Sequence, residues 1–169
     1  MGHGLEGDDR AAYTARRDEL SAQYLVPRDQ RPASSARGVH HTAHISSDVE
    51  RTIRFYVEVC GFPLLEMFEN RDFQGSTHFF FDLGHGNTLA YFDLPGLDVV
   101  PYQEVLGGHH HLAISMERDE WEAARERLVA AGIEHAHVDG SSLYFRGPDG
   151  ERLELISDPL LEMYGKSVG

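Results

Sequence analysis

The stretch GVHHTAHISSDVERTIRFYVEVCGF, residues 38–62, predicts how this chain folds. It opens with a short β-like run, GVHHTAHI, and continues with the features of an amphipathic helix. Ser47 and Glu50 have the spacing of a capping box, which opens a helix by bonding its first free N–H groups. Apolar residues then recur at helical spacing as far as Cys60, and Gly61 stands where a helix would end. The stretch therefore predicts a strand followed by a helix.

Three further strand-like runs follow this helix and complete a βαβββ unit. They are PLLEMFE, THFFFDL and NTLAYFDL, separated by Gly- and Asn-containing turns. The same order then recurs: HHHLAISM predicts a strand, a helix capped by Asp119 follows, and IEHAHV, SSLYFRG and GERLELIS predict three strands. His41 precedes Gly61 by 20 residues and His111 precedes Gly132 by 21, so the two histidines hold equivalent positions in a repeat.

The repeat predicts an α+β protein with two tandem βαβββ modules. We expect the first module at 38–95, a connector at 96–108, the second module at 109–158 and a C-terminal tail at 159–169. Residues 1–37 differ in composition: the charged, Ala-rich stretch Asp8–Tyr24 favours a helix, and a Pro-, Ser- and Arg-containing linker follows it. We expect this N-terminal helical extension to act as an oligomer contact or a lid.

The composition indicates an acidic cytoplasmic protein. The 15 basic residues against 28 acidic ones give a net charge of −13, which opposes binding to nucleic acid or to an anionic membrane. No apolar run approaches the length of a membrane span. Cys60 is the only cysteine, so no disulfide can form within the chain and a reducing compartment is favoured.

Three ligand-type residues fall at related places in the repeat: His41, His111 and Glu154. Alternation along each strand separates them from neighbours such as His40. A carboxylate inside the run LELI is costly to bury unless a metal or a base neutralises it. Two imidazoles and one carboxylate on a metal leave positions open, as in non-haem Fe(II) oxygenases. The alternative is that Glu154 pairs with Arg152 at a strand edge and that both histidines are structural.

Residues 38–158 resemble the vicinal oxygen chelate superfamily. The resemblance is carried by VHHTAHISSDVERTIRFYVEVCGF, by HHLAI and by YFRGPDGERLE. That superfamily includes glyoxalase I, fosfomycin-resistance transferases, bleomycin-resistance proteins and extradiol dioxygenases. The resemblance implies that the two modules form a curved mixed sheet around a metal cavity. It also implies a divalent metal held there by His41, His111 and Glu154, with Fe(II) favoured and Mn(II), Zn(II) or Ni(II) as alternatives.

The resemblance also bears on the reaction. Ala90 stands where glyoxalase I has a fourth ligand, which weighs against that enzyme. The run GIEHAHVDGSSLYFRGPDGERLE is similar to the signature of extradiol dioxygenases, and this implies catalytic roles for His135 and Tyr144. Asn87 stands where those enzymes have an acid–base histidine, which departs from their pattern and makes Asn87 the third candidate catalytic residue.

From the resemblance we expect a metal-dependent enzyme, foremost an Fe(II) extradiol-type dioxygenase acting on a catechol-like small molecule. His78 and Phe80 share a strand face and are candidates for the substrate pocket. One alternative is a Mn(II)-, Zn(II)- or Ni(II)-dependent lyase, transferase or isomerase of the glyoxalase or fosfomycin-resistance kind. Another is a metal-free binding protein of the bleomycin-resistance kind. We expect a homodimer, in which the modules either close within a chain or are exchanged between chains.

Overall fold

A computed structural model describes residues 5–168, and the chain divides into two units, Met1–Arg37 and Gly38–Gly169. The first unit contains the predicted helix, α1 (Gly7–Tyr24), and a short 3₁₀ turn, η1 (Arg28–Gln30). None of the side chains of α1 is buried. The second unit contains both predicted modules.

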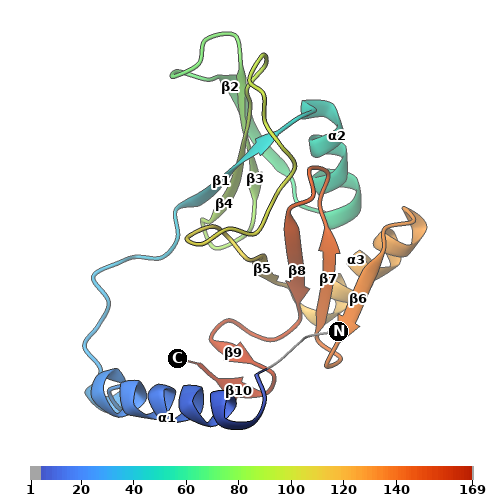
Figure 1. Cartoon of the computed structure of the whole chain (residues 1–169). Helices are drawn as coiled ribbons and strands as arrows, with labels where there is room; N and C mark the ends of the chain where they lie inside the picture. The colour runs from blue at the N-terminus through green and yellow to red at the C-terminus, as the bar shows by residue number, and fades with distance from the viewer. Residues whose placement is uncertain (1–4, 169) are drawn as a thin grey trace. The chain divides into compact units, whose positions relative to one another are not determined.

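The first module of the second unit is a four-stranded sheet with a helix on one face (Figure 1). Its strand order is β1-β4-β3-β2, with β1 and β4 parallel and the other pairs antiparallel. The elements are β1 (His41–Ser46), α2 (Val49–Arg54), a π-helical continuation η2 (Phe55–Cys60), β2 (Leu64–Glu69), β3 (Thr77–Asp82) and β4 (Thr88–Asp93).

The second module repeats this topology, with strand order β5-β8-β7-β6 and a parallel β5–β8 pair. Its elements are β5 (Leu112–Ser115), α3 (Arg118–Ala130), β6 (His135–Val138), β7 (Ser142–Arg146) and β8 (Arg152–Ile156). A short antiparallel hairpin follows, formed by β9 (Glu162–Met163) and β10 (Lys166–Ser167). The tandem βαβββ fold and the N-terminal helix are therefore confirmed, although the eight module strands form two separate four-stranded sheets.

Both predicted helix caps are wrong by one or two residues. Asp48, not Ser47, caps α2, because its side chain accepts a hydrogen bond from the Arg51 N–H at 3.0 Å. Ser47 bonds instead to Asp149 of the second module. The α3 helix begins one residue before Asp119, and its N-terminal residue makes no side-chain cap bond.

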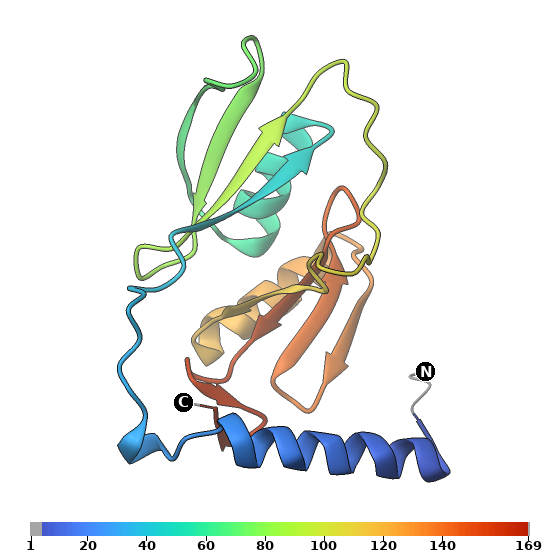
Figure 2. The same ribbon diagram turned by 60° about the vertical axis from the view of Figure 1, so that its left-hand side comes forward.

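Each module sheet carries its helix on one face (Figure 2). The two modules share one hydrophobic core on the helix-facing side of these sheets. Trp121 of α3 is fully buried there, and its indole N–H donates to the Leu155 carbonyl at 2.9 Å. The strands contribute alternate residues to this core, namely Phe79, Phe81, Leu89, Tyr91, Leu143, Phe145, Leu153 and Leu155. Because strand side chains alternate, the other residues of these strands lie on the opposite face, and that face carries the candidate site.

Candidate metal centre

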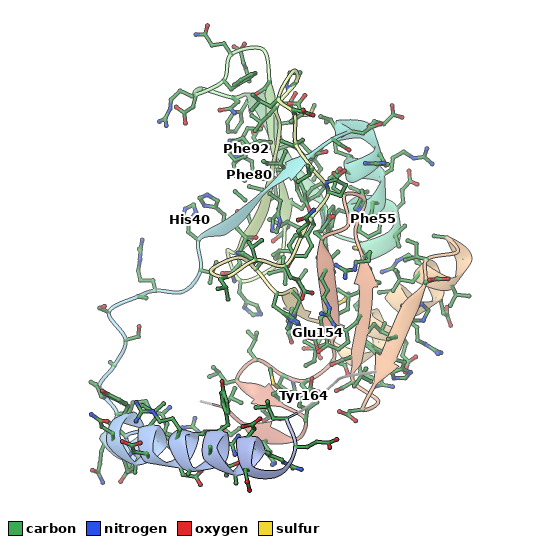
Figure 3. The ribbon with its side chains drawn as sticks, viewed as in Figure 1. His40, Phe55, Phe80, Phe92, Glu154 and Tyr164 are labelled. Atoms are coloured by element: carbon green, nitrogen blue, oxygen red, sulfur yellow. The ribbon has the colours of Figure 1, made fainter. Side chains whose placement is uncertain are left out.

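The second module brings two of the predicted ligands together. His111 Nε2 lies 3.0 Å from Glu154 Oε2. Glu154, labelled in Figure 3, is 1% exposed, and its Oε1 accepts a hydrogen bond from Ser142 Oγ at 2.6 Å. A carboxylate so deeply buried needs donors or a cation on both oxygens, and here one oxygen faces an imidazole nitrogen. The pair fits as part of a nitrogen and oxygen ligand set, which Fe(II), Mn(II), Zn(II) and Ni(II) all accept.

Each predicted ligand histidine is preceded by a second histidine that contacts it. The His110 and His111 Nδ1 atoms are 2.7 Å apart, and those of His40 and His41 are 2.9 Å apart. The ring planes cross at 77° in one pair and 78° in the other. Because Nδ1 of each predicted ligand is engaged by its neighbour, Nε2 is the nitrogen left to bind a metal. Because adjacent residues of a strand alternate between its two faces, the sequence predicted that the two histidines of each pair point apart, and it did not predict this contact.

Tyr144 lies beside the His111–Glu154 pair. It is directly opposite Glu154 across the β7–β8 ladder, and its ring centroid is 5.7 Å from that of His111. Burial, a 3.3 Å contact with the Tyr164 hydroxyl and the Glu154 carboxylate all raise the pKa of Tyr144. The phenol therefore stays protonated and can donate a hydrogen bond. Tyr164 comes from the β9–β10 hairpin, and no sequence signal pointed to it.

The first module places His41 beside an aromatic wall. His41 is exposed on the site face of its sheet, with its ring centroid 6.4 Å from that of Phe80. The His78 ring stacks on Phe92 at 3.9 Å, lies 4.2 Å from Phe80 and contacts Phe68 at 5.3 Å. Burial, followed by the neighbouring His41, lowers the pKa of His78. His78 Nε2 is buried in this wall and has no hydrogen-bond partner.

The two parts of the site do not meet within one chain. Across residues 5–168, no three His, Cys, Asp or Glu side chains lie close enough together to hold one metal ion. His41 is on the sheet of the first module, whereas His111 and Glu154 belong to the second. One chain therefore presents two complementary parts of the predicted ligand set.

The structure places His135 on the opposite face of its sheet from Glu154, although His135 borders the same cavity as Tyr144. In the β6–β7 ladder His135 lies opposite Phe145, a core residue, and so faces away from Glu154. Its Nδ1 lies 3.1 Å from the Ile133 carbonyl. The next residue on the same face, His137, packs its ring 5.3 Å from Trp121. The pairing register with β7 determines which side chains of β6 lie on which face, and the sequence of β6 alone does not reveal this register.

Asn87 also has a local structural role. Its side-chain amide donates to the Gly84 carbonyl at 3.2 Å and its backbone N–H donates to the same oxygen at 2.9 Å. These bonds close the turn between β3 and β4, so the Asn87 amide donor is already engaged. Ala90 is fully buried in β4 and offers no ligand atom.

A family model described as the Glyoxalase/Bleomycin resistance protein/Dioxygenase superfamily matches residues 38–155. Metallothiol transferase FosB of Lysinibacillus sphaericus is 26% identical over 148 residues, covering 78% of this chain and 92% of the relative. Catechol-2,3-dioxygenase of Bacillus subtilis is 28% identical over 129 residues, covering 71% of this chain but 43% of the relative.

Solved structures show the same fold. A glyoxalase family protein from Enterococcus faecalis is 30% identical with a TM-score of 0.56, covering 72% of this chain and 98% of its own. The fosfomycin resistance protein FosX of Listeria monocytogenes is 24% identical with a TM-score of 0.56, covering 73% of this chain and 94% of its own in a complex with Mn(II). No helix within residues 5–168 is long and apolar enough to cross a bilayer.

Proposed function

The chain belongs to the glyoxalase/bleomycin resistance protein/dioxygenase superfamily, and on this premise we propose that it is an Fe(II) extradiol-type dioxygenase. Its substrate is an aromatic compound with two adjacent hydroxyl groups. Residues His41, His111 and Glu154 hold the metal. The observation that carries the proposal is the aromatic wall of His78, Phe80 and Phe92 beside the first of these ligands.

The wall favours a flat aromatic substrate over a small polar one. Aromatic side chains bind another ring through stacked or edge-to-face contacts and exclude water from it. His78 Nε2 is buried in this wall and has no hydrogen-bond partner, so the wall presents chiefly ring surface to a substrate. Bound Fe(II) would supply open positions for both diol oxygens and for O2 and would pass electrons between them.

The chain's own residues have defined tasks in this proposal. Ser142 holds Oε1 of Glu154, so the carboxylate keeps one orientation and offers Oε2. His110 engages Nδ1 of His111 and leaves its Nε2 for the metal. Tyr144, which stays protonated, donates a hydrogen bond to the substrate oxygen nearest Glu154.

The separation of the ligands within one chain supports a site built by two copies. In this arrangement His41 of one copy joins His111 and Glu154 of a second copy, and two identical sites form. A closed dimer with a two-fold axis satisfies this requirement, because each copy supplies what the other lacks.

The test is oxygen uptake by purified protein with a panel of catechols. Fe(II)-loaded protein is expected to consume oxygen only with a diol, whereas Glu154→Ala loses both bound metal and activity. Glu126→Ala, which removes an exposed carboxylate from α3, is the matched control and keeps both. Oxygen uptake without Fe(II), or none with it, contradicts the proposal. Unchanged metal content in Glu154→Ala contradicts the ligand role of Glu154 and supports a binding protein that holds no metal at this site.

A thiol transferase is the second candidate, and one observation favours it. The chain matches FosB over 92% of the relative's length but matches the catechol dioxygenase over only 43%. Such an enzyme needs a thiol from outside, because Cys60 is buried and burial raises the pKa of its thiol. Loss of free thiol with Mn(II), fosfomycin and an added low-molecular-weight thiol identifies this activity.

A further inference from the structure

Two arginines lie directly opposite each other next to the His111–Glu154 pair. In the β7–β8 ladder Arg146 is opposite Arg152, and the next pair on the same face is Tyr144 and Glu154. Like charges at directly opposite positions destabilise a sheet. Two arginines on the same sheet face as Glu154, in the neighbouring residue pair, are unexpected in a protein with a net charge of −13.

The positive charge at this place is only partly balanced. Arg152 forms an ion pair with Glu104 of the connector at 3.1 Å, and the side chains are 33% and 50% exposed. Arg146 is exposed and donates to the Gly150 carbonyl at 2.9 Å. Within residues 5–168 it has no carboxylate within 4.0 Å, so its guanidinium charge is unpaired there.

Arg152 is also in contact with the predicted metal site. Its Nη1 lies 3.0 Å from His110 Nε2, and His110 in turn contacts His111. Its guanidinium lies 5.9 Å from the centre of the Tyr144 ring. Both arginines and Tyr144 line a cavity of about 830 Å³. An anion bound between the two arginines would therefore lie beside the position proposed for the substrate.

We propose that the substrate carries an anionic group, a carboxylate or a phosphonate, and that Arg146 and Arg152 bind it. The planar guanidinium group donates two parallel N–H bonds to either anion. The bound anion also removes the repulsion between the two arginines. This inference rests on the proposed function, because it concerns the substrate of the same site.

The test compares two diols that differ in charge. Calorimetry on anaerobic Fe(II)-loaded protein measures the Kd of 3,4-dihydroxybenzoate and of its neutral analogue 3,4-dihydroxybenzamide. We expect the wild-type protein to bind the benzoate at least about tenfold more tightly. Arg146→Gln and Arg152→Gln are expected to remove most of this preference, and in Arg146→Gln the Kd of the amide stays within about twofold. Arg146→Lys retains part of it.

Arg54→Gln is the matched control, since it removes the same charge from an exposed position on α2 and is expected to keep the preference. Metal content and thermal unfolding are measured for every variant. An unchanged preference in both glutamine variants, or an equal loss for benzoate and amide, overturns the inference. If the wild-type protein binds neither diol, the dioxygenase proposal fails. The Kd of fosfomycin for Mn(II)-loaded protein is then measured instead. Weaker binding of fosfomycin by Arg146→Gln than by the wild type supports the anion site, and an equal Kd overturns it.

Discussion

Glu151 is a buried carboxylate that joins both modules through hydrogen bonds. It is 6% exposed, and its Oε1 accepts from the Tyr56 hydroxyl at 3.0 Å and the Tyr91 hydroxyl at 2.9 Å. Its Oε2 accepts from the Asp149 N–H at 2.9 Å. Glu151→Ala leaves the Asp149 N–H and one of the two tyrosine hydroxyls, which lie 2.7 Å apart, without an acceptor, so we expect it to lower the free energy of unfolding by about 3 kcal/mol. Urea unfolding followed by circular dichroism measures the change.

Two variants show whether the loss comes from the hydrogen bonds. Tyr91→Phe removes one hydroxyl and is expected to cost about 1 kcal/mol. Glu126→Ala removes an exposed carboxylate from α3 and should change the free energy of unfolding by no more than about 0.5 kcal/mol. Equal losses in Glu151→Ala and Glu126→Ala would show that the buried network adds no stability.

At the level of single residues, alternation along a strand predicted the face of a side chain correctly where the strand was long or where the repeat fixed its position. It predicted that His111 and Glu154 share a face, and the structure brings them to 3.0 Å. The catalytic role of His135 came from the resemblance and not from alternation, and the register with β7 places His135 on the opposite face of its sheet from Glu154. Glu151 gave no signal, since a carboxylate after a turn has the appearance of a surface residue.

At the level of elements, Arg127 of α3 stabilises the end of the helix of the other module. Its guanidinium donates to the carbonyl oxygens of Val59 at 2.8 Å and Cys60 at 3.3 Å, where η2 ends. The last carbonyl groups of a helix have no partner within it, and a cation there also interacts favourably with the helix dipole. We expect Arg127→Met to lower the free energy of unfolding by about 2 kcal/mol. Thermal and urea unfolding measure it.

Arg125→Met is the matched control, because Arg125 lies on the same helix and pairs only with nearby Glu122 at 3.5 Å. We expect a loss within about 0.5 kcal/mol. Gly61→Ala provides an independent test, since Gly61 has φ +81° and an added Cβ would lie 2.9 Å from Arg127 Nη2. Equal losses in Arg127→Met and Arg125→Met contradict the proposed stabilisation.

The order and type of the elements followed from periodicity, but their ends did not. Apolar residues at helical spacing predicted one helix as far as Cys60, and the helix does extend that far. Its second half, Phe55–Cys60, is π-helical, a change of hydrogen-bond pattern that leaves no residue signature. The cap of α2 moved from Ser47 to Asp48 because Asp149, 102 residues away, engages Ser47. Contacts that are distant in sequence decided these details.

At the level of the whole molecule, the repeat predicted two modules but not how they associate. The structure places His41 and the His111–Glu154 pair on separate sheets of one chain. Neither module sequence contains information on whether its partner is in the same chain. The connector between β4 and β5 has no regular secondary structure, so it imposes no particular pairing.

Mixing two inactive variants tests the proposed two-copy site. His41→Ala lacks one part of the ligand set and Glu154→Ala lacks the other, so neither is expected to retain metal alone. In a mixed dimer with exchanged modules, one of the two sites has all three native ligands. Random assembly of an equal mixture makes half of the dimers mixed, so about a quarter of the wild-type metal content per chain should return. Metal analysis after refolding the mixture measures this.

The pair His111→Ala and Glu154→Ala is the control for this experiment. Both changes fall in the same part of the ligand set, so no mixed dimer contains an intact site under either arrangement. Restored metal binding in the first mixture but not in the second therefore requires that His41 acts on a second copy. If the first mixture forms dimers and still retains no metal, each site closes within one chain, and the separation of the ligands in the single chain is not explained by exchange.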